Sequence, residues 1–141
     1  MFKWLWICLV LFSCSFNRVD KHHFRQGRWK EYYDDEKTQV MWKGRYKNHH
    51  QIGHWKYYST SGVIYLEERY KKQNLIQTVY YDSKGRKHLS GDAVYYETLD
   101  TAYYRWEGDW LKYDTTGQVV EVSYYKFGKF AWNKPPGATR K

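Results

Sequence analysis

Three segments of this chain begin with the same pattern, G-x-W-x-x-Y, starting at Gly27, Gly53 and Gly108. A pattern that returns every 20 to 50 residues or so indicates a repeat architecture, in which each unit is one supersecondary element stacked on its neighbours. No other feature of the sequence constrains the fold as strongly. We therefore expect a chain of similar units.

A fourth, degenerate copy lies between the second and third complete ones and has Thr78 at the tryptophan position. Successive markers at Trp29, Trp55, Thr78 and Trp110 are 26, 23 and 32 residues apart. A further tryptophan, Trp132, opens a truncated last copy. We expect the motif positions to serve the architecture: Gly27, Trp29, Tyr32, Gly53, Trp55, Tyr58, Gly62, Tyr81, Gly85, Gly108, Trp110, Tyr113 and Gly117.

Each unit reads as a β-hairpin. Small polar residues closed by Gly62, Gly85 or Gly117 predict turns, because glycine adopts positive φ without steric cost. The first copy has the run Asp34–Lys37 instead. The second strands are predicted at 39–47, 63–71, 86–97 and 118–126. Aromatic residues make up 21% of the chain and favour strands, and alternation puts each motif tryptophan and tyrosine on opposite faces.

This pattern, followed by a strand that ends in E-x-x-Y, resembles the MORN-repeat class. It is most similar to the bacterial branch of YwqK-type antitoxin repeats, and the best copy runs from Gly53 through Gly62 to Glu67-Glu-Arg-Tyr70. The resemblance covers residues 27 to 133. It implies an all-β fold, an elongated, twisted antiparallel sheet of successive hairpin repeats. Thr78 and the long third unit depart from the pattern.

The N-terminus reads as a targeting signal. Lys3 precedes an apolar run from Trp4 to Phe12, which is too short to span a membrane and suits the core of a signal peptide. The run ends in Leu-Phe-Ser-Cys14, which resembles the bacterial lipoprotein signal. We expect a signal peptide at 1–13, a lipidated Cys14 with a polar tether at 14–26, and a basic tail at 134–141. An ordinary cleaved signal is the alternative.

The sequence offers no catalytic constellation, and we expect neither an enzyme nor a cofactor. Most acidic residues fall in predicted turns or beside Lys and Arg. His49, His50 and His54 lie in or beside one predicted turn, and zinc usually needs three or four ligands of fixed spacing. We interpret these histidines as solvated turn residues and leave metal binding open.

The formal net charge of +9 favours acidic partners. The sequence predicts a membrane-anchored lipoprotein of the bacterial cell envelope, held in the outer membrane or periplasm if the cell is Gram-negative. It would act as a binding or scaffold module for a protein or an anionic glycan. Nucleic acid is disfavoured because an exported protein rarely meets it. An antitoxin or immunity-like protein that binds a toxin is the alternative, as the family resemblance implies.

The lipidation hypothesis predicts how two cysteine variants will behave. Cys14→Ala removes the site of acylation, so the protein should leave the membrane fraction, because stable anchoring requires acyl chains. Cys8→Ala, within the apolar run, is the matched control and should stay in that fraction. Fractionation of cells that express each variant measures this, and a Cys14→Ala protein that remains membrane-bound contradicts the hypothesis.

Overall fold

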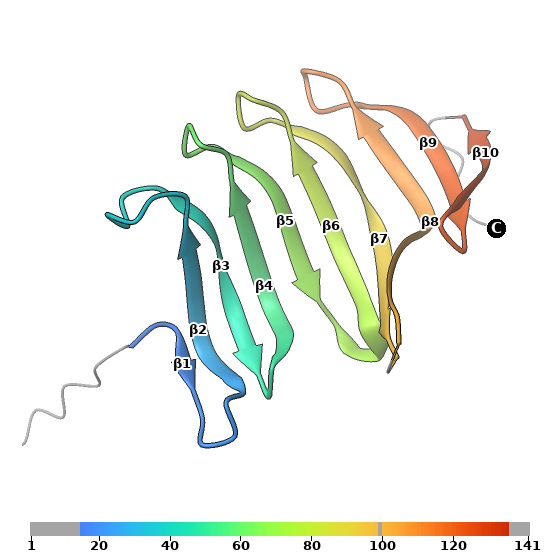
Figure 1. Ribbon diagram of the computed structural model, residues 1–141. Coiled ribbons are helices and arrows are strands. Elements are labelled where there is room, and N and C mark those ends of the chain that lie inside the picture. Colours follow the sequence, from blue (N-terminus) through green and yellow to red (C-terminus); the bar gives the residue numbers. More distant parts are fainter. Residues whose placement is uncertain (1–14, 99, 136–141) are drawn as a thin grey trace, which may run out of the picture.

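The computed structural model describes residues 15–98 and 100–135, which form one elongated, single-layered antiparallel sheet (Figure 1). In this part of the chain, ten strands lie side by side in sequence order. The predicted all-β sheet of successive hairpins is confirmed. The elements are β1 (Arg18–Val19), β2 (Arg25–Tyr32), β3 (Val40–Lys47), β4 (His50–Tyr58), β5 (Ile64–Tyr70), the 3-10 turn η1 (Lys72–Asn74), β6 (Leu75–Tyr81), β7 (Lys87–Glu97), β8 (Ala102–Tyr113), β9 (Val119–Lys126) and β10 (Lys129–Lys134).

The hairpin turns follow the sequence signals. The tips that join β2 to β3, β4 to β5, β6 to β7 and β8 to β9 all lie along the upper edge of the sheet in Figure 1. Gly62, Gly85 and Gly117 close three of them with φ of 79°, 74° and 87°. In the first copy Lys37 adopts the left-handed conformation instead, and its amide donates to the Asp34 carbonyl. The predicted second strands agree with β3, β5, β7 and β9 to within one residue at either end.

The Gly-x-Trp part of the motif forms a bulge. The three residues Gly53–Trp55 of β4 lie opposite the single residue Gly44 of β3, and Gly108–Trp110 of β8 lie opposite Gly91 of β7. The leading glycines have φ of 67° and 75°, which other residues rarely adopt. The bulge folds each tryptophan ring over the glycine of the preceding strand. A Cβ atom at Gly44 or Gly91 would overlap the ring.

Motif tryptophans and tyrosines lie on opposite faces, as side-chain alternation predicts. We call the face that carries Trp55 the tryptophan face. On the other face, the Tyr58 ring lies 5.2 Å from Lys43 Nζ and the Tyr113 ring lies 4.1 Å from Lys87 Nζ. Both are cation–π contacts, which lie at the surface of the sheet.

The core consists mainly of rings that cover one another on the tryptophan face. Trp55 and Trp110 are 0% and 1% exposed, although no second layer covers the sheet among the described residues. Trp55 lies against Trp42 and Tyr46, with ring centroids 5.3 and 4.9 Å apart. Trp110 stacks on Trp106 at 3.7 Å. Two aromatic clusters therefore stabilise the two ends of the sheet.

The segment 15–26, which we expected to be a tether, belongs to the sheet. It contains β1 and the beginning of β2. The Asn17 side chain both accepts from the Lys30 amide and donates to its carbonyl, each at 2.9 Å. The Trp29 indole donates to the Arg18 carbonyl at 3.2 Å. A strand of two residues is too short to show alternation, so the sequence pattern missed it.

The C-terminal boundary shifts by one residue. Lys134, expected to begin the basic tail, is the last residue of β10, and its Nζ lies 2.8 Å from the Asp109 carboxylate. The signal peptide at 1–13, Cys14 and the tail from residue 136 onward lie outside the described residues.

The overlap between a Cβ at Gly44 and the Trp55 ring predicts a strong coupling between these two positions. Gly44→Ala should lower the free energy of unfolding by about 1–3 kcal/mol, because it overpacks a filled site. In a Trp55→Leu background the same change should cost little, because the ring has gone. Arg45→Ala, at the exposed position on the other side of Gly44, is the control and should stay within about 0.5 kcal/mol. Urea denaturation of the wild type, the two single variants, the double variant and the control measures the coupling, and an equal cost of Gly44→Ala in both backgrounds contradicts it.

Candidate functional site

The degenerate unit differs from its neighbours in backbone register. β5 and β6 pair without a bulge, so that Glu68 lies directly opposite Thr78. Glu68 holds the position on β5 that Gly44 holds on β3 and Gly91 holds on β7. Where Thr78 replaces tryptophan, no ring has to lie on the preceding strand. A long side chain therefore fits on the tryptophan face at this point.

Glu68 lies at the centre of a hydrogen-bonded cluster. It is 5% exposed, and its Oε2 accepts from the Tyr57 hydroxyl at 3.0 Å. The Tyr70 hydroxyl lies 3.1 Å from the same oxygen and shares its one proton between Glu68 and Gln51 Oε1. Thr78 Oγ1 and the Tyr104 hydroxyl are 3.0 Å apart and share a hydrogen bond. Since a buried carboxylate is costly without hydrogen bonds, these tyrosines stabilise it.

The same burial alters the acidity of the phenols. Burial raises the pKa of Tyr57 and Tyr70 well above the ordinary value, and the neighbouring charge of Glu68 raises both further. Both phenols therefore stay protonated as hydrogen-bond donors far into the alkaline range.

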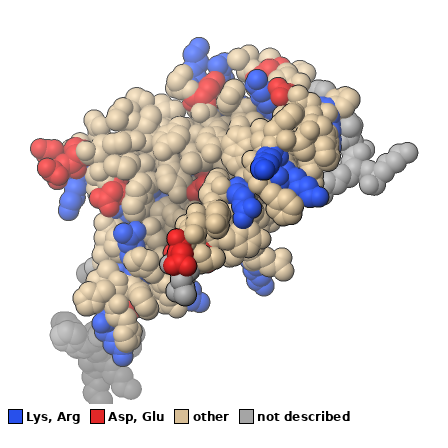
Figure 2. Space-filling view, turned by 45° about the vertical axis from the view of Figure 1, so that its right-hand side comes forward, with Lys and Arg blue, Asp and Glu red and all other residues tan. Residues whose placement is uncertain are grey.

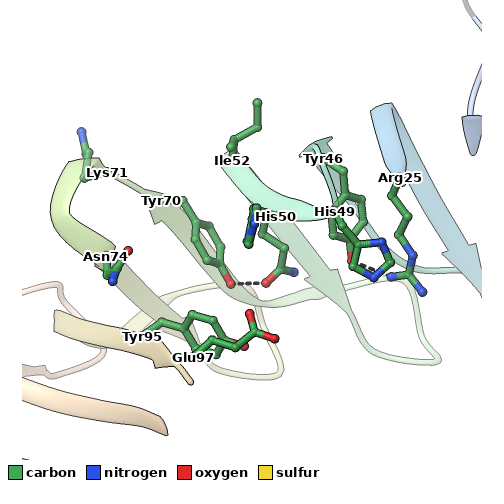
Figure 3. Close-up of a pocket in the computed structure, with 11 residues that line it drawn as sticks. Arg25, Tyr46, His49, His50, Ile52, Tyr70, Lys71, Asn74, Tyr95 and Glu97 are labelled. Carbon is green, nitrogen blue, oxygen red and sulfur yellow. Dashed lines mark hydrogen bonds between the residues drawn. The ribbon is translucent and has the colours of Figure 1, made fainter. Parts of the chain in front are cut away.

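A groove of about 420 Å³ opens beside this cluster, at the edge of the sheet that is lowest in Figure 1. Figure 3 shows Tyr70 and its hydrogen bond to Gln51 at the middle of the groove, with Arg25 and His49 at one end and Tyr95 and Glu97 along the other wall. The lining residues come from β2, β3, β4, β5 and β7 and two turns: Arg25, Tyr46, His49, His50, Gln51, Ile52, Tyr70, Lys71, Asn74, Tyr95 and Glu97.

The length of the third unit accounts for one wall of the groove. β7 and β8 have 11 and 12 residues and are the longest strands in the described part of the chain. Their hairpin extends past the β5–β6 turn, which brings Tyr95 and Glu97 to the groove. The long spacing between Thr78 and Trp110 is therefore a structural extension that contributes to the site.

Arg25 is held in place from several sides. Its Nη1 donates to the Tyr46 hydroxyl at 2.9 Å, and its guanidinium lies 5.1 Å from both the Trp29 and Tyr46 ring centroids. The His49 amide donates to the Arg25 carbonyl, and His49 has a φ of 70°. Backbone in this left-handed region is uncommon for residues other than glycine and often occurs at functional sites.

The residues singled out by the sequence lie mainly outside the groove. None of the thirteen motif positions that we expected to be structural lines it, although Tyr70, which ends the E-x-x-Y segment of the best copy, does. His49 and His50 do line it, whereas the His54 imidazole lies 3.4 Å from Glu67. Arg25, Gln51, Tyr95 and Glu97 gave no sequence signal, because they come together only through the sheet.

Two features are absent from the described residues. No group of three or more His, Cys, Asp or Glu residues there is arranged to hold a metal ion. That part of the chain also contains no helix long and apolar enough to cross a membrane.

No family model, curated protein or solved structure matches this chain. The resemblance to MORN repeats therefore stays a prediction, and the function has to be argued from the site.

The Glu68 cluster predicts an unusual tyrosine titration. Above the ordinary tyrosine pKa of about 10, unfolded chains lose protons that the folded chain keeps on Tyr57 and Tyr70. The free energy of unfolding should therefore fall as the pH rises above about 10. Glu68→Gln removes the charge that helps to raise the pKa of Tyr57 and of Tyr70. These phenols should therefore ionise at lower pH in the folded variant than in the folded wild type.

Absorbance at alkaline pH measures phenolate formation, and the wild type should retain un-ionised tyrosines at a pH where Glu68→Gln has lost them. Glu121→Gln, at an exposed carboxylate 3.8 Å from Lys112 Nζ, is the control and should titrate like the wild type. Identical curves for Glu68→Gln and the wild type would show that the carboxylate does not govern these phenols.

Proposed function

We propose that this protein is a non-enzymatic, lipid-anchored protein of the bacterial envelope that binds a partner in the groove of the tryptophan face. The observation that carries the proposal is the place of the groove. It lies where the repeat departs from its own pattern, at the β5–β6 unit and the extended β7–β8 hairpin. A local departure from the repeat pattern that creates a groove lined by aromatic and polar side chains fits a binding role better than a purely architectural one.

The chemistry of the groove supports binding. Its wall combines aromatic rings with amide, imidazole, guanidinium and carboxylate groups, which can donate and accept hydrogen bonds. The regular units on either side support this wall through the Trp55 and Trp110 clusters. A site built on strands is held more firmly than one built on loops.

Surface charge supports an acidic partner without pointing to a polyanion such as nucleic acid. Figure 2 shows Lys and Arg side chains in separate groups, with Asp and Glu between them. On this face the basic side chains therefore form no single continuous patch. Such a surface attracts acidic partners at long range and leaves specificity to the local site.

A second surface favours the antitoxin-like alternative. Tyr96, Tyr103 and Phe127 are 47%, 45% and 67% exposed, and the Arg105 guanidinium lies 4.9 Å from the Tyr103 ring. Exposed aromatic residues around an arginine are typical of protein–protein contacts. A toxin or another protein would bind on this patch rather than in the groove.

Crosslinking of the full chain in native membranes, followed by a pull-down, tests the two surfaces. Tyr95→Ala alters the groove, and Phe127→Asn alters the patch while tolerating the left-handed backbone at that residue, whose φ is 53°. If the groove is the site, Tyr95→Ala loses the partner and Phe127→Asn retains it. Capture should also weaken as salt shortens the screening length from about 10 Å at 0.1 M.

The reverse pattern would favour the antitoxin-like alternative. Capture of the same partner by both variants, at melting temperatures equal to that of the wild type, would exclude both surfaces as the binding site.

A further inference from the structure

We propose that the groove recognises an acidic saccharide, with the carboxylate or phosphate of a sugar residue on Arg25 and its hydroxyls on the opposite wall. This inference rests on the proposed function, because it takes the groove as the site of binding. It adds the chemical class of the ligand and the role of each wall.

Arg25 supplies the anion-binding end. Its contacts with Tyr46 and Trp29 fix the plane of the guanidinium, and only one of its donors is used by the Tyr46 hydroxyl. None of the ion pairs within residues 15–98 and 100–135 involves Arg25. A planar, pre-organised guanidinium with free donors is the group that best matches a carboxylate or phosphate.

Lys71 adds a second cation to the lining of the groove. It lies at the other end from Arg25 and takes part in no ion pair of the described residues. His49 lies at the same end as Arg25 in Figure 3, and its ring packs 6.4 Å from Tyr46. The lining therefore carries two cations, Arg25 and Lys71, and one carboxylate, Glu97.

The opposite wall argues for a sugar rather than a bare polyanion. Glu97 lines the groove and would repel a phosphate-rich chain, yet its carboxylate can accept hydrogen bonds from hydroxyls. Asn74 and Gln51 add amide groups, and the Tyr95 ring offers an apolar surface beside Glu97. A ligand with one acidic group, several hydroxyls and an apolar ring face could contact the guanidinium, the carboxylate and amide groups, and the tyrosine ring at the same time.

The size of the groove agrees with a short saccharide. Its volume of about 420 Å³ falls inside the range of about 300–1,000 Å³ that small-ligand sites occupy. The strands that border it, β2 and β7, are the second and seventh of the ten in sheet order and lie on either side of the β5–β6 pair. The ligand would therefore contact both sides of that pair.

Titration calorimetry of the full chain in detergent tests the inference with an aldobiouronic acid, a disaccharide of one uronic acid and one neutral sugar, as the acidic probe and its methyl ester as the neutral probe. The acid should bind, and both the ester and the Arg25→Gln variant should bind at least about tenfold more weakly, as expected when a charge-assisted hydrogen bond is lost. Lys84→Gln makes the same change of charge in the turn at the upper edge of the sheet and should leave the Kd unchanged within about twofold.

A second arm separates a soluble glycan from a lipid headgroup. Vesicles that contain a glucuronosyl glycolipid are compared with vesicles that contain its neutral glucosyl counterpart. Binding to the acidic vesicles but not to the aldobiouronic acid identifies a membrane lipid as the source of the sugar, and the same loss in Arg25→Gln still supports the proposed chemistry.

Three results would overturn the inference: equal binding of acid and ester, equal weakening by Arg25→Gln and Lys84→Gln, or no binding of either acidic probe. The proposed function fails separately. If crosslinking in native membranes still returns a groove-dependent partner that Arg25→Gln retains, the groove binds something other than an acidic sugar and the binding role remains.

Discussion

The contact between a tryptophan ring and a glycine of the preceding strand determines how this sheet is stabilised. A single-layered sheet has no opposing layer against which to bury side chains, so the sheet must form its own core. The bulge at Gly53–Trp55 turns the ring back over the Gly44 backbone, and the same happens at Trp110 and Gly91. Neighbouring rings then cover the tryptophan completely. The hairpins β4–β5 and β8–β9 are thereby each joined to the hairpin before them by a hydrophobic contact as well as by backbone hydrogen bonds.

The degenerate unit shows what happens when this contact is absent. Thr78 replaces the tryptophan, and Glu68 replaces the glycine that would have received the ring. The two substitutions are sterically compatible. Because Thr78 has no ring to place over β5, the longer side chain of Glu68 fits there. The core at this point becomes a hydrogen-bonded cluster of a carboxylate and tyrosines instead of stacked rings. The repeat thus contains one polar unit between aromatic ones, and the groove opens beside it.

The sequence predicted the local parts of the fold and missed the parts that depend on pairing across strands. Turn glycines and alternating aromatic residues act within a few residues, so the strands β3, β5, β7 and β9 were located to within one residue. Gly44 and Gly91 carry no local signal, because their role depends on a ring from the next strand. The groove was missed for the same reason, since Arg25 and Glu97 are distant in sequence and come together only through the register and curvature of the sheet.

The position of the groove has a thermodynamic consequence for a protein of this architecture. In repeat proteins the free energy of unfolding is close to the sum of the stabilities of the single repeats and of the interfaces between neighbouring repeats. Local unfolding therefore begins at the interface that contributes least. The β5–β6 interface lacks a tryptophan–glycine contact and depends on Glu68 and its tyrosines. The groove spans this interface, with Arg25 on the side of the Trp55 cluster and Glu97 on the side of the Trp110 cluster. Because a ligand that binds only the folded state stabilises it, an occupant that contacts both walls would reinforce the interface that the missing tryptophan leaves without a ring contact.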